Sequence, residues 1–112
     1  MGIPLTVWST AYNQKRPYLG LDDLNNAISH IIKSNLINNE IYNLLSYNSK
    51  VRDIIEILKI KLDVSIKYVE HEIMNQLSYE VSNQKFTDTN FKFSSNIQKE
   101  ISETLDNIKN LR

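Results

Sequence analysis

The two histidines are the first residues to consider for metal or acid–base chemistry. His71-Glu72 begins like the His-Glu-x-x-His motif of zinc enzymes, but Asn75 occupies the position of the second histidine. Two imidazoles four residues apart are needed to share one metal ion on a helix, so the motif is incomplete. His30 falls on the face of its predicted helix opposite the apolar residues, and we expect it to face solvent. The sequence therefore predicts no metal site.

Other catalytic patterns are also incomplete. The chain has no cysteine, and neither histidine has a serine partner in a local motif for nucleophilic catalysis. Tyr12 precedes Lys15 by three residues, as Tyr47 precedes Lys50, whereas a catalytic Tyr-x-x-x-Lys pair has a spacing of four. The two glycines are too few for a glycine-rich phosphate loop. We expect no catalytic residue in this chain.

Arg16 is the charged residue best placed to bind an anion. It precedes Pro17, which favours extended backbone before it, and it begins a segment that leads into a helix. A guanidinium on rigid backbone suits bidentate capture of phosphate or carboxylate. The simpler alternative is a surface arginine paired with an acid. Trp8 could stack on a ligand ring at the end of a strand, although packing in the core is its simpler role.

Composition limits the class of protein. The chain has 112 residues and a mass of 13.1 kDa, enough for one small domain. Its 13 basic residues balance 13 acidic ones, which disfavours nucleic-acid binding, and the absence of cysteine excludes a disulfide framework. No run of 18 apolar residues and no signal peptide can be recognised, so we expect a cytoplasmic domain without a membrane contact.

The hydrophobic pattern predicts a mixed α/β domain with short strands and three main helices. Strands are expected at 3–8, 40–46 and 64–69, and the segment 16–19 should be extended. Apolar residues at helical spacing predict helices over 21–34, 50–62 and 96–111, and a short helix should start at Ser82. The predicted N-caps are Asp22 or Asp23, Ser49, and a Ser95–Gln98 capping box.

The predicted core is thin for a chain of this length. Five large residues fall outside the apolar stripes of the helices and need cover from elsewhere. We therefore expect the domain to pack against another domain or a second copy of itself. These residues are Leu36, Ile37, Ile57, Ile60 and Tyr68.

Two N-terminal segments resemble a known family. Residues 2–8 and 16–28 are similar to the run G-x-P-L-T-V-[WYF]…R-D-[FY]-[VI]-x-V-x-D-[LV]-x-x-A of NAD-dependent epimerase/dehydratases, in the extended short-chain dehydrogenase/reductase class. Residues 41–44, 49–58, 77–82, 85–91 and 101–105 resemble later segments of this family in the same order. The resemblance covers nearly the whole chain but only the C-terminal part of the usual family length.

The resemblance implies a small lobe that completes a nucleotide-sugar site beside a Rossmann domain. Arg16 would contact the diphosphate, Tyr18 would line the same pocket, and Asp23 would cap the helix as a structural residue. Ser82 and Lys85 match a motif that is mainly structural. Pro17 and Gly20 depart from the pattern, which has aspartate at the first position and histidine or tyrosine at the second.

Further departures bear on activity. The family's second arginine, expected between about 69 and 77, is absent, as are the glycine fingerprint and the Tyr-x-x-x-Lys pair. The resemblance thus implies that residues 1–112 form a single C-terminal substrate-binding domain whose N-terminal Rossmann domain is absent. Such a segment is catalytically inactive and binds no cofactor alone, while its parent uses NAD(P). The expected partners are a nucleotide sugar, the Rossmann domain and a second copy. The alternative is a stand-alone interaction module that kept the fold and lost the ligand site.

Overall fold

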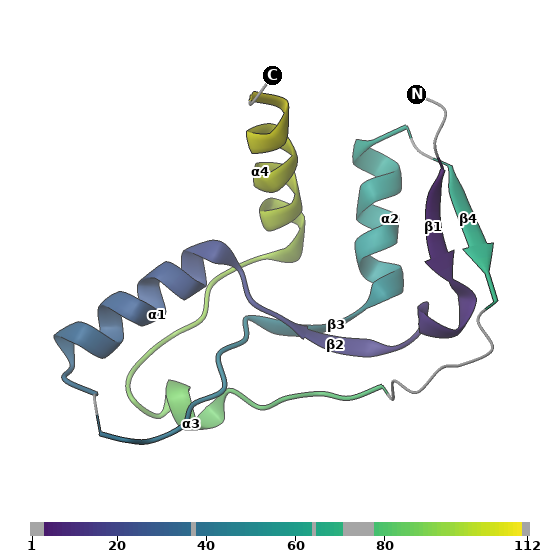
Figure 1. Ribbon diagram of the computed structural model, residues 1–112. Helices are drawn as coiled ribbons and strands as arrows, with labels where there is room; N and C mark the ends of the chain where they lie inside the picture. Colours follow the sequence, from purple (N-terminus) through teal and green to yellow (C-terminus); the bar gives the residue numbers. More distant parts are fainter. Residues whose placement is uncertain (1–3, 37, 64, 71–77, 111–112) are drawn as a thin grey trace.

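A computed structural model describes residues 4–36, 38–63, 65–70 and 78–110 of the chain (Figure 1). The fold class is confirmed as mixed α/β with short strands. In chain order the elements are β1 (Leu5–Trp8), the 3₁₀ turn η1 (Ser9–Ala11), β2 (Lys15–Tyr18), α1 (Leu21–Lys33), β3 (Tyr47–Lys50), α2 (Val51–Lys61), β4 (Ile66–Val69), α3 (Gln84–Thr87) and α4 (Ile97–Asn110).

The described strands form two separate pairs. β1 pairs in parallel with β4, with Leu5 opposite Ile66, and this pairing confirms strands within the predicted 3–8 and 64–69 segments. β2 pairs antiparallel with β3, with Tyr18 opposite Tyr47. Since β3 runs directly into α2, the second pair connects to the helix that packs against α4 (Figure 1).

The helix α1 follows the predicted apolar pattern and ends where the sequence predicts. Asn35 adopts a left-handed φ of 54°, a conformation that asparagine tolerates better than most residues. The amides of Asn35 and Leu36 donate to the carbonyls of Ile32 and Ile31, at 3.4 and 3.1 Å. This arrangement is a Schellman motif, and it turns the chain away from the helix axis.

Aromatic rings form the main buried cluster of the described chain. Phe86 of α3 is fully buried, and its ring centroid lies 5.4 Å from that of Tyr42 and 5.0 Å from that of Phe91. His30 of α1 also joins this cluster, 5.2 Å from the Phe91 ring. Its Nε2 lies 2.9 Å from the Thr89 carbonyl oxygen, so the expectation of a solvent-facing His30 is wrong.

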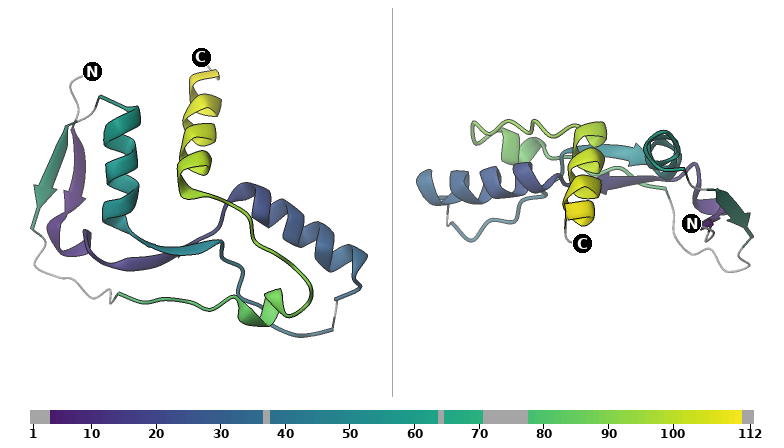
Figure 2. Two further views of the ribbon diagram at one scale, coloured as in Figure 1. Left: turned by 180° about the vertical axis from the view of Figure 1, so that it is seen from behind. Right: turned by 90° about the horizontal axis from the view of Figure 1, so that it is seen from above.

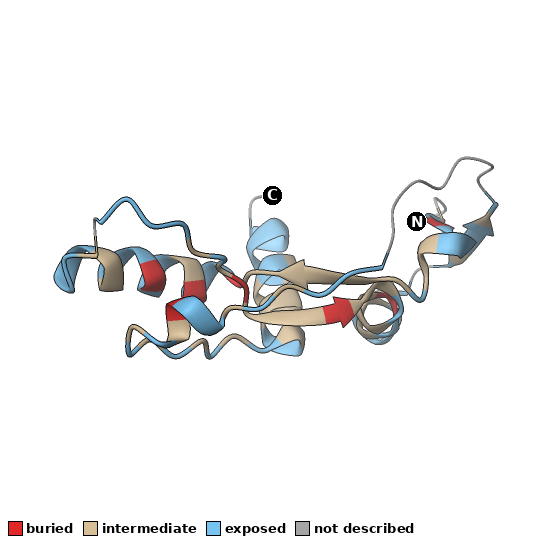
Figure 3. Cartoon of the chain, turned by 90° about the horizontal axis from the view of Figure 1, so that it is seen from below, coloured by how far each residue is buried: buried red, intermediate tan, exposed pale blue. Residues whose placement is uncertain are grey.

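The molecule is flat and extended (Figure 2). Its radius of gyration is 16.9 Å, whereas a compact domain of this length has a value of about 13 Å. Its accessible surface is 8310 Å², which exceeds by roughly 1,900 Å² the area of a compact monomer of this mass. Buried positions are correspondingly few along the ribbon (Figure 3).

Several large apolar side chains remain exposed, as the thin predicted core implies. Ile60 is 85% exposed and Tyr68 is 46% exposed, while Leu36 and Ile57 are half-buried and residue 37 lies outside the described residues. Trp8 is 43% exposed, so the expectation that it packs in the core is wrong. Among the described helices, none combines the length and apolar character needed to cross a bilayer.

The strand predicted over 40–46 is wrong, because the chain forms β3 at Tyr47–Lys50 instead. The backbone before β3 is bound by side chains from the α3 region rather than by a neighbouring strand. Lys85 Nζ donates to the Ile41 carbonyl at 2.9 Å, and Asn83 Nδ2 donates to the Leu45 carbonyl at 2.8 Å. The apolar residues that suggested a strand therefore lie in irregular backbone beside the aromatic cluster.

The caps predicted for α2 and α4 are also wrong by one residue. Lys50 is the N-cap of α2, and Asp53 accepts hydrogen bonds from the Lys50 amide and the Ser49 hydroxyl. Before α4, Asn96 Oδ1 accepts from the amides two and three residues later, at 2.9 and 3.3 Å. These bonds satisfy amides of the first turn that have no partner within the helix.

Candidate functional site

The buried carboxylate of Asp23 joins three segments of the chain. Asp23 is fully buried in the first turn of α1, and its Oδ2 accepts a hydrogen bond from the Ser46 hydroxyl at 2.6 Å. The amides of Ser94 and Ser95 donate to its two oxygens, each at 2.9 Å. The expectation that Asp23 caps α1 is wrong, because the N-cap is Gly20 and the carboxylate binds other segments. Asp23 instead fixes the chain before β3 and before α4 against α1.

These hydrogen bonds also decide the ionisation of Asp23. Burial favours the neutral acid, but the donors from Ser46, Ser94 and Ser95 outweigh it and hold the pKa of Asp23 below its ordinary value. The group is therefore a carboxylate at neutral pH. Each of its donors faces a full negative charge, which strengthens these bonds.

Gly20 is required by a close approach rather than by its backbone angles. A Cβ at this position would lie 2.1 Å from Ser95 Oγ and 2.9 Å from Glu100 Oε1. Its φ of −71° is open to any residue. The absence of a side chain thus lets the segment before α4 and the first turn of α4 approach the start of α1.

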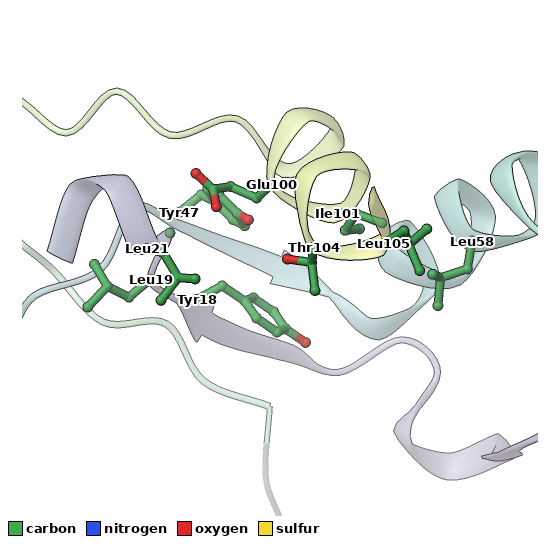
Figure 4. Close-up of a pocket in the computed structure, with 10 residues that line it drawn as sticks. Tyr18, Leu19, Leu21, Tyr47, Leu58, Glu100, Ile101, Thr104 and Leu105 are labelled. Atoms are coloured by element: carbon green, nitrogen blue, oxygen red, sulfur yellow. The ribbon is translucent and has the colours of Figure 1, made fainter. Parts of the chain in front are cut away.

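A pocket of about 280 Å³ lies between the end of β2, the start of β3 and one side of α4 (Figure 4). Its walls combine apolar side chains with two phenols, a hydroxyl and a carboxylate. The lining residues are Tyr18, Leu19, Gly20, Leu21, Tyr47, Leu58, Glu100, Ile101, Thr104 and Leu105.

The two tyrosines form a stacked pair across the strands at the base of this pocket. Tyr18 and Tyr47 are direct partners in the β2–β3 register, and their ring centroids lie 6.1 Å apart with an interplanar angle of 28°. Burial raises the pKa of both phenols, and the charge of Glu100 raises the pKa of Tyr47 further. Both tyrosines are protonated at neutral pH and present hydroxyl groups with hydrogen-bonding capacity.

Arg16 lies on β2 two residues before Tyr18, on the same side of the strand. Its guanidinium donates to the Lys15 carbonyl and to Gln14 Oε1, both at 2.8 Å, and lies 5.0 Å from the centre of the Tyr79 ring. The positive charge of Arg16 opposes the rise in the Tyr18 pKa, which places it within electrostatic range of that phenol. The guanidinium is thus held in place by Lys15, Gln14 and Tyr79, and Arg16 is not one of the residues that line the pocket.

Glu100 is the functional candidate that sequence reasoning missed. Its Oε1 is buried and, within the described residues, has no hydrogen-bond partner. Its carboxylate also gathers with those of Asp22 and Glu103, with oxygens within 4.8 Å of one another. Acidic groups of this kind are common on exposed surfaces without an ion, and we assign no metal to them. Only the position of Glu100 beside Gly20 distinguishes it from other helix carboxylates, and this position depends on the fold.

The remaining sequence candidates lie apart from the pocket or outside the described residues. Tyr12 donates to Glu56 at 3.2 Å, and Lys15 pairs with Glu80, so this tyrosine and lysine do not act together. Lys85 binds Glu40 at 2.6 Å, in keeping with a structural role. His71 and most of the stretch where a second arginine was expected, residues 71–77, lie outside the described residues.

Comparison with models of known protein families finds no match, and comparison with curated protein sequences finds none either. Among solved structures, the chain is similar to RMD from Pseudomonas aeruginosa, solved in complex with NADPH, with a TM-score of 0.72 and 20% sequence identity. The similarity covers 89% of this chain and 34% of that chain, so this chain spans about a third of the length of its structural neighbour. The fold of this chain therefore resembles part of the fold of RMD.

Proposed function

We propose that the chain is the substrate-binding region of an NAD(P)-dependent enzyme that acts on nucleotide sugars, of the extended short-chain dehydrogenase/reductase type. In this function the chain holds the nucleotide sugar, while a Rossmann domain of the parent protein holds the cofactor and the catalytic residues. The chain alone contributes binding and no hydride transfer, because the hydride comes from the nicotinamide cofactor.

The observation that carries this proposal is the likeness in fold to about a third of a protein solved with NADPH. The likeness extends over 89% of the chain. The family resemblance of residues 2–8 and 16–28, which was found from the sequence alone, agrees with this likeness.

The charges around the pocket agree with a nucleotide-sugar ligand. Arg16 is fixed near Tyr18 and offers a planar cation of the kind that binds phosphate oxygens in pairs. The pocket itself offers phenols, a hydroxyl and apolar surface, which suit a polar ring rather than a phosphate. The site thus supports a ligand with an anionic part and a neutral part.

The large accessible surface of the chain also agrees with packing against a second domain. The excess area of roughly 1,900 Å² is larger than the area of about 800 Å² that each partner buries in an ordinary protein interface. A Rossmann domain packed on this chain would cover part of that area. Residues such as Ile41 and Ile60, 84% and 85% exposed, would be candidates for such cover.

One observation favours the alternative of an interaction module without a ligand. The Arg16 guanidinium already donates to its own loop through Gln14 and Lys15. In an interaction module these bonds would serve to stiffen the loop. The two functions differ in whether the isolated chain responds to a nucleotide sugar.

Thermal unfolding with separate additions of UDP-glucose, GDP-mannose, dTDP-glucose and NADPH tests the proposal. A ligand at ten times its Kd adds about 1.4 kcal/mol of stability, which raises the Tm of a domain of this size by roughly 5 °C. We expect at least one nucleotide sugar to produce such a rise and NADPH alone to produce none. Stabilisation by NADPH alone, with no response to any nucleotide sugar, would contradict the proposal.

A further inference from the structure

We propose that the exposed apolar face of α1 binds the same face of a second copy of this chain, with the two helices antiparallel. This inference goes beyond the proposed function, because it names a contact between copies of the chain and makes no use of a nucleotide sugar.

The helix α1 carries large apolar side chains on a side that the rest of the described chain leaves uncovered. Leu21, Ile28 and Ile32 are 63%, 47% and 68% exposed. Since an α-helix turns by about 100° per residue, these three residues lie within about 40° of one another around the helix axis. Asp23 and Ala27 are buried on another side of the helix, so the packing of α1 on its own chain does not use this face.

The pattern of the face is that of a helix packed against another helix. The half-buried residues Leu24 and Ile31 lie beside the exposed ones and widen the face to about 100°. At positions 21, 24, 28 and 31 the apolar residues alternate in spacings of three and four, as in the seam of a coiled coil. Among the described elements, no other helix or strand makes an extensive contact with α1, which lies at the opposite end of the molecule from β1 and β4 (Figure 2).

The absence of charge on this face identifies a second copy as the partner. The polar residues that border it are Asn25 and Ser29, and the charged residues Asp22 and Lys33 lie further around the helix. A face with net charge repels an identical face, whereas a neutral apolar face is complementary to its own copy. A contact about a two-fold axis, the commonest symmetry of homo-oligomers, pairs a surface with itself in this way.

The charges at the two ends of α1 decide the direction of the pairing. The carboxylates of Asp22, Glu100 and Glu103 gather near its N-terminal end, with oxygens within 4.8 Å of one another, while Lys33 lies in its last turn. Parallel helices would bring two such acidic groups together. Antiparallel helices bring the acidic group of each copy toward Lys33 of the other copy, and they also place opposite ends of the helix dipoles side by side.

The size of the face fits a weak dimer. The helix α1 has 13 residues and a length of about 20 Å. Each partner in an ordinary protein interface buries about 800 Å², and this chain exposes roughly 1,900 Å² more than a compact monomer of its mass. The excess area is sufficient for such a contact, but one short helix supplies only part of 800 Å². We therefore expect a dissociation constant in the micromolar range.

Sedimentation velocity of the full chain and of two lysine variants tests the assignment of the face. Ile28→Lys places a charge at the centre of the face, and we expect the association constant to fall by at least about tenfold, because the charge would be buried without a partner. Ile108→Lys is the matched control. Ile108 is 54% exposed near the end of α4, so it makes the same change away from α1, and its association constant should stay within twofold of the wild-type value.

Single cysteines test the direction of the helices, because the chain has no cysteine of its own. Leu21→Cys and Ile32→Cys are mixed in equal amounts and oxidised, and mass spectrometry measures the disulfide-linked dimers. Antiparallel helices place residue 21 of one copy near residue 32 of the other, so the mixed disulfide should exceed the share that random pairing gives. An excess of disulfides between identical variants, or random pairing, overturns the antiparallel arrangement.

Two further results overturn the proposal as a whole: a wild-type chain that stays at 13.1 kDa up to about 100 μM, or an equal fall in association for Ile28→Lys and Ile108→Lys. Neither result bears on the proposed function, which depends on the response of the chain to nucleotide sugars. Circular dichroism confirms that each variant is folded. If Ile28→Lys is unfolded, Ile32→Lys takes its place with the same expected fall.

Discussion

The Asp23 carboxylate accepts a hydrogen bond of 2.6 Å from the Ser46 hydroxyl, and the same hydroxyl accepts one of 2.9 Å from the Gly20 amide. Ser46 therefore joins the start of α1 to the residue that precedes β3. Tyr47 follows Ser46 directly, and Gly20 contacts the segment before α4. The hydrogen bonds of Asp23 and Ser46 therefore fix the relative positions of several segments that line the pocket.

We expect Asp23→Asn to lower the free energy of unfolding by about 2–3 kcal/mol. The substitution keeps the size of the side chain but replaces one acceptor oxygen with a donor group that faces the amides of Ser94 and Ser95. Urea denaturation measures the effect. Asp22→Asn is the control, because Asp22 is exposed and should change stability by less than about 0.5 kcal/mol. Equal stability of Asp23→Asn and the wild type would show that Asp23 does not hold these segments.

Asp23 should also give the chain a specific sensitivity to acid. Its pKa is lowered in the folded protein, so its contribution to stability is fully present above its unfolded pKa of about 3.8 and is lost as the pH falls through the folded pKa. The stability difference between wild type and Asp23→Asn should be constant from pH 7 to about pH 5 and shrink below that. Urea midpoints between pH 7 and pH 3 measure this difference. A difference that grows toward acid pH would show that the sign of the shift is wrong.

Gly20→Ala should destabilise the chain by about 1–3 kcal/mol, as overpacking of a close contact does. The new methyl group would meet Ser95 Oγ at 2.1 Å and Ser95 Cβ at 2.5 Å, while the backbone angles suit alanine. A double-mutant cycle with Ser95→Gly isolates this contact. We expect Ser95→Gly to recover most of the loss in the double variant. If the two effects simply add, the contact with Ser95 does not explain the need for glycine.

The sequence predicts the regular elements of this fold much better than its long-range contacts. The helices α1, α2 and α4 follow from apolar residues at helical spacing, and β1 and β4 from short β-branched runs. In contrast, β3 is the polar segment Tyr47–Lys50, which forms a strand only because β2 lies beside it. The preceding segment, 40–46, fits the strand pattern better, and it is not a strand.

The candidate site shows the same limit. Arg16 and Tyr18 were found because a local motif contains them, and the fold brings both to one side of β2. The roles of Asp23 and Glu100 depend on Ser94, Ser95 and Gly20, which lie some 70 or 80 residues away in the chain. Nothing in the local pattern around either carboxylate predicts these partners.

The uncovered surface should make the isolated chain associate with itself. Its excess area and exposed side chains such as Ile32 and Ile60, 68% and 85% exposed, leave apolar surface in contact with water. We expect sedimentation velocity to show a weight-average mass that rises with concentration in the micromolar range. A single species of 13.1 kDa at all concentrations up to about 100 μM would contradict this expectation.

The central claim is that this chain binds the phosphates of a nucleotide sugar through Arg16, and calorimetric titration of Arg16→Ala tests it most directly. The control is Arg52→Ala, because Arg52 is exposed on α2 and removes the same charge away from the pocket. We predict that Arg16→Ala weakens the binding of the nucleotide sugar that stabilises the wild type by at least about tenfold, since charge-assisted bonds to phosphate are lost, and that Arg52→Ala leaves it within twofold. Equal affinity of Arg16→Ala and wild type, or an equal loss in Arg52→Ala, would contradict the account.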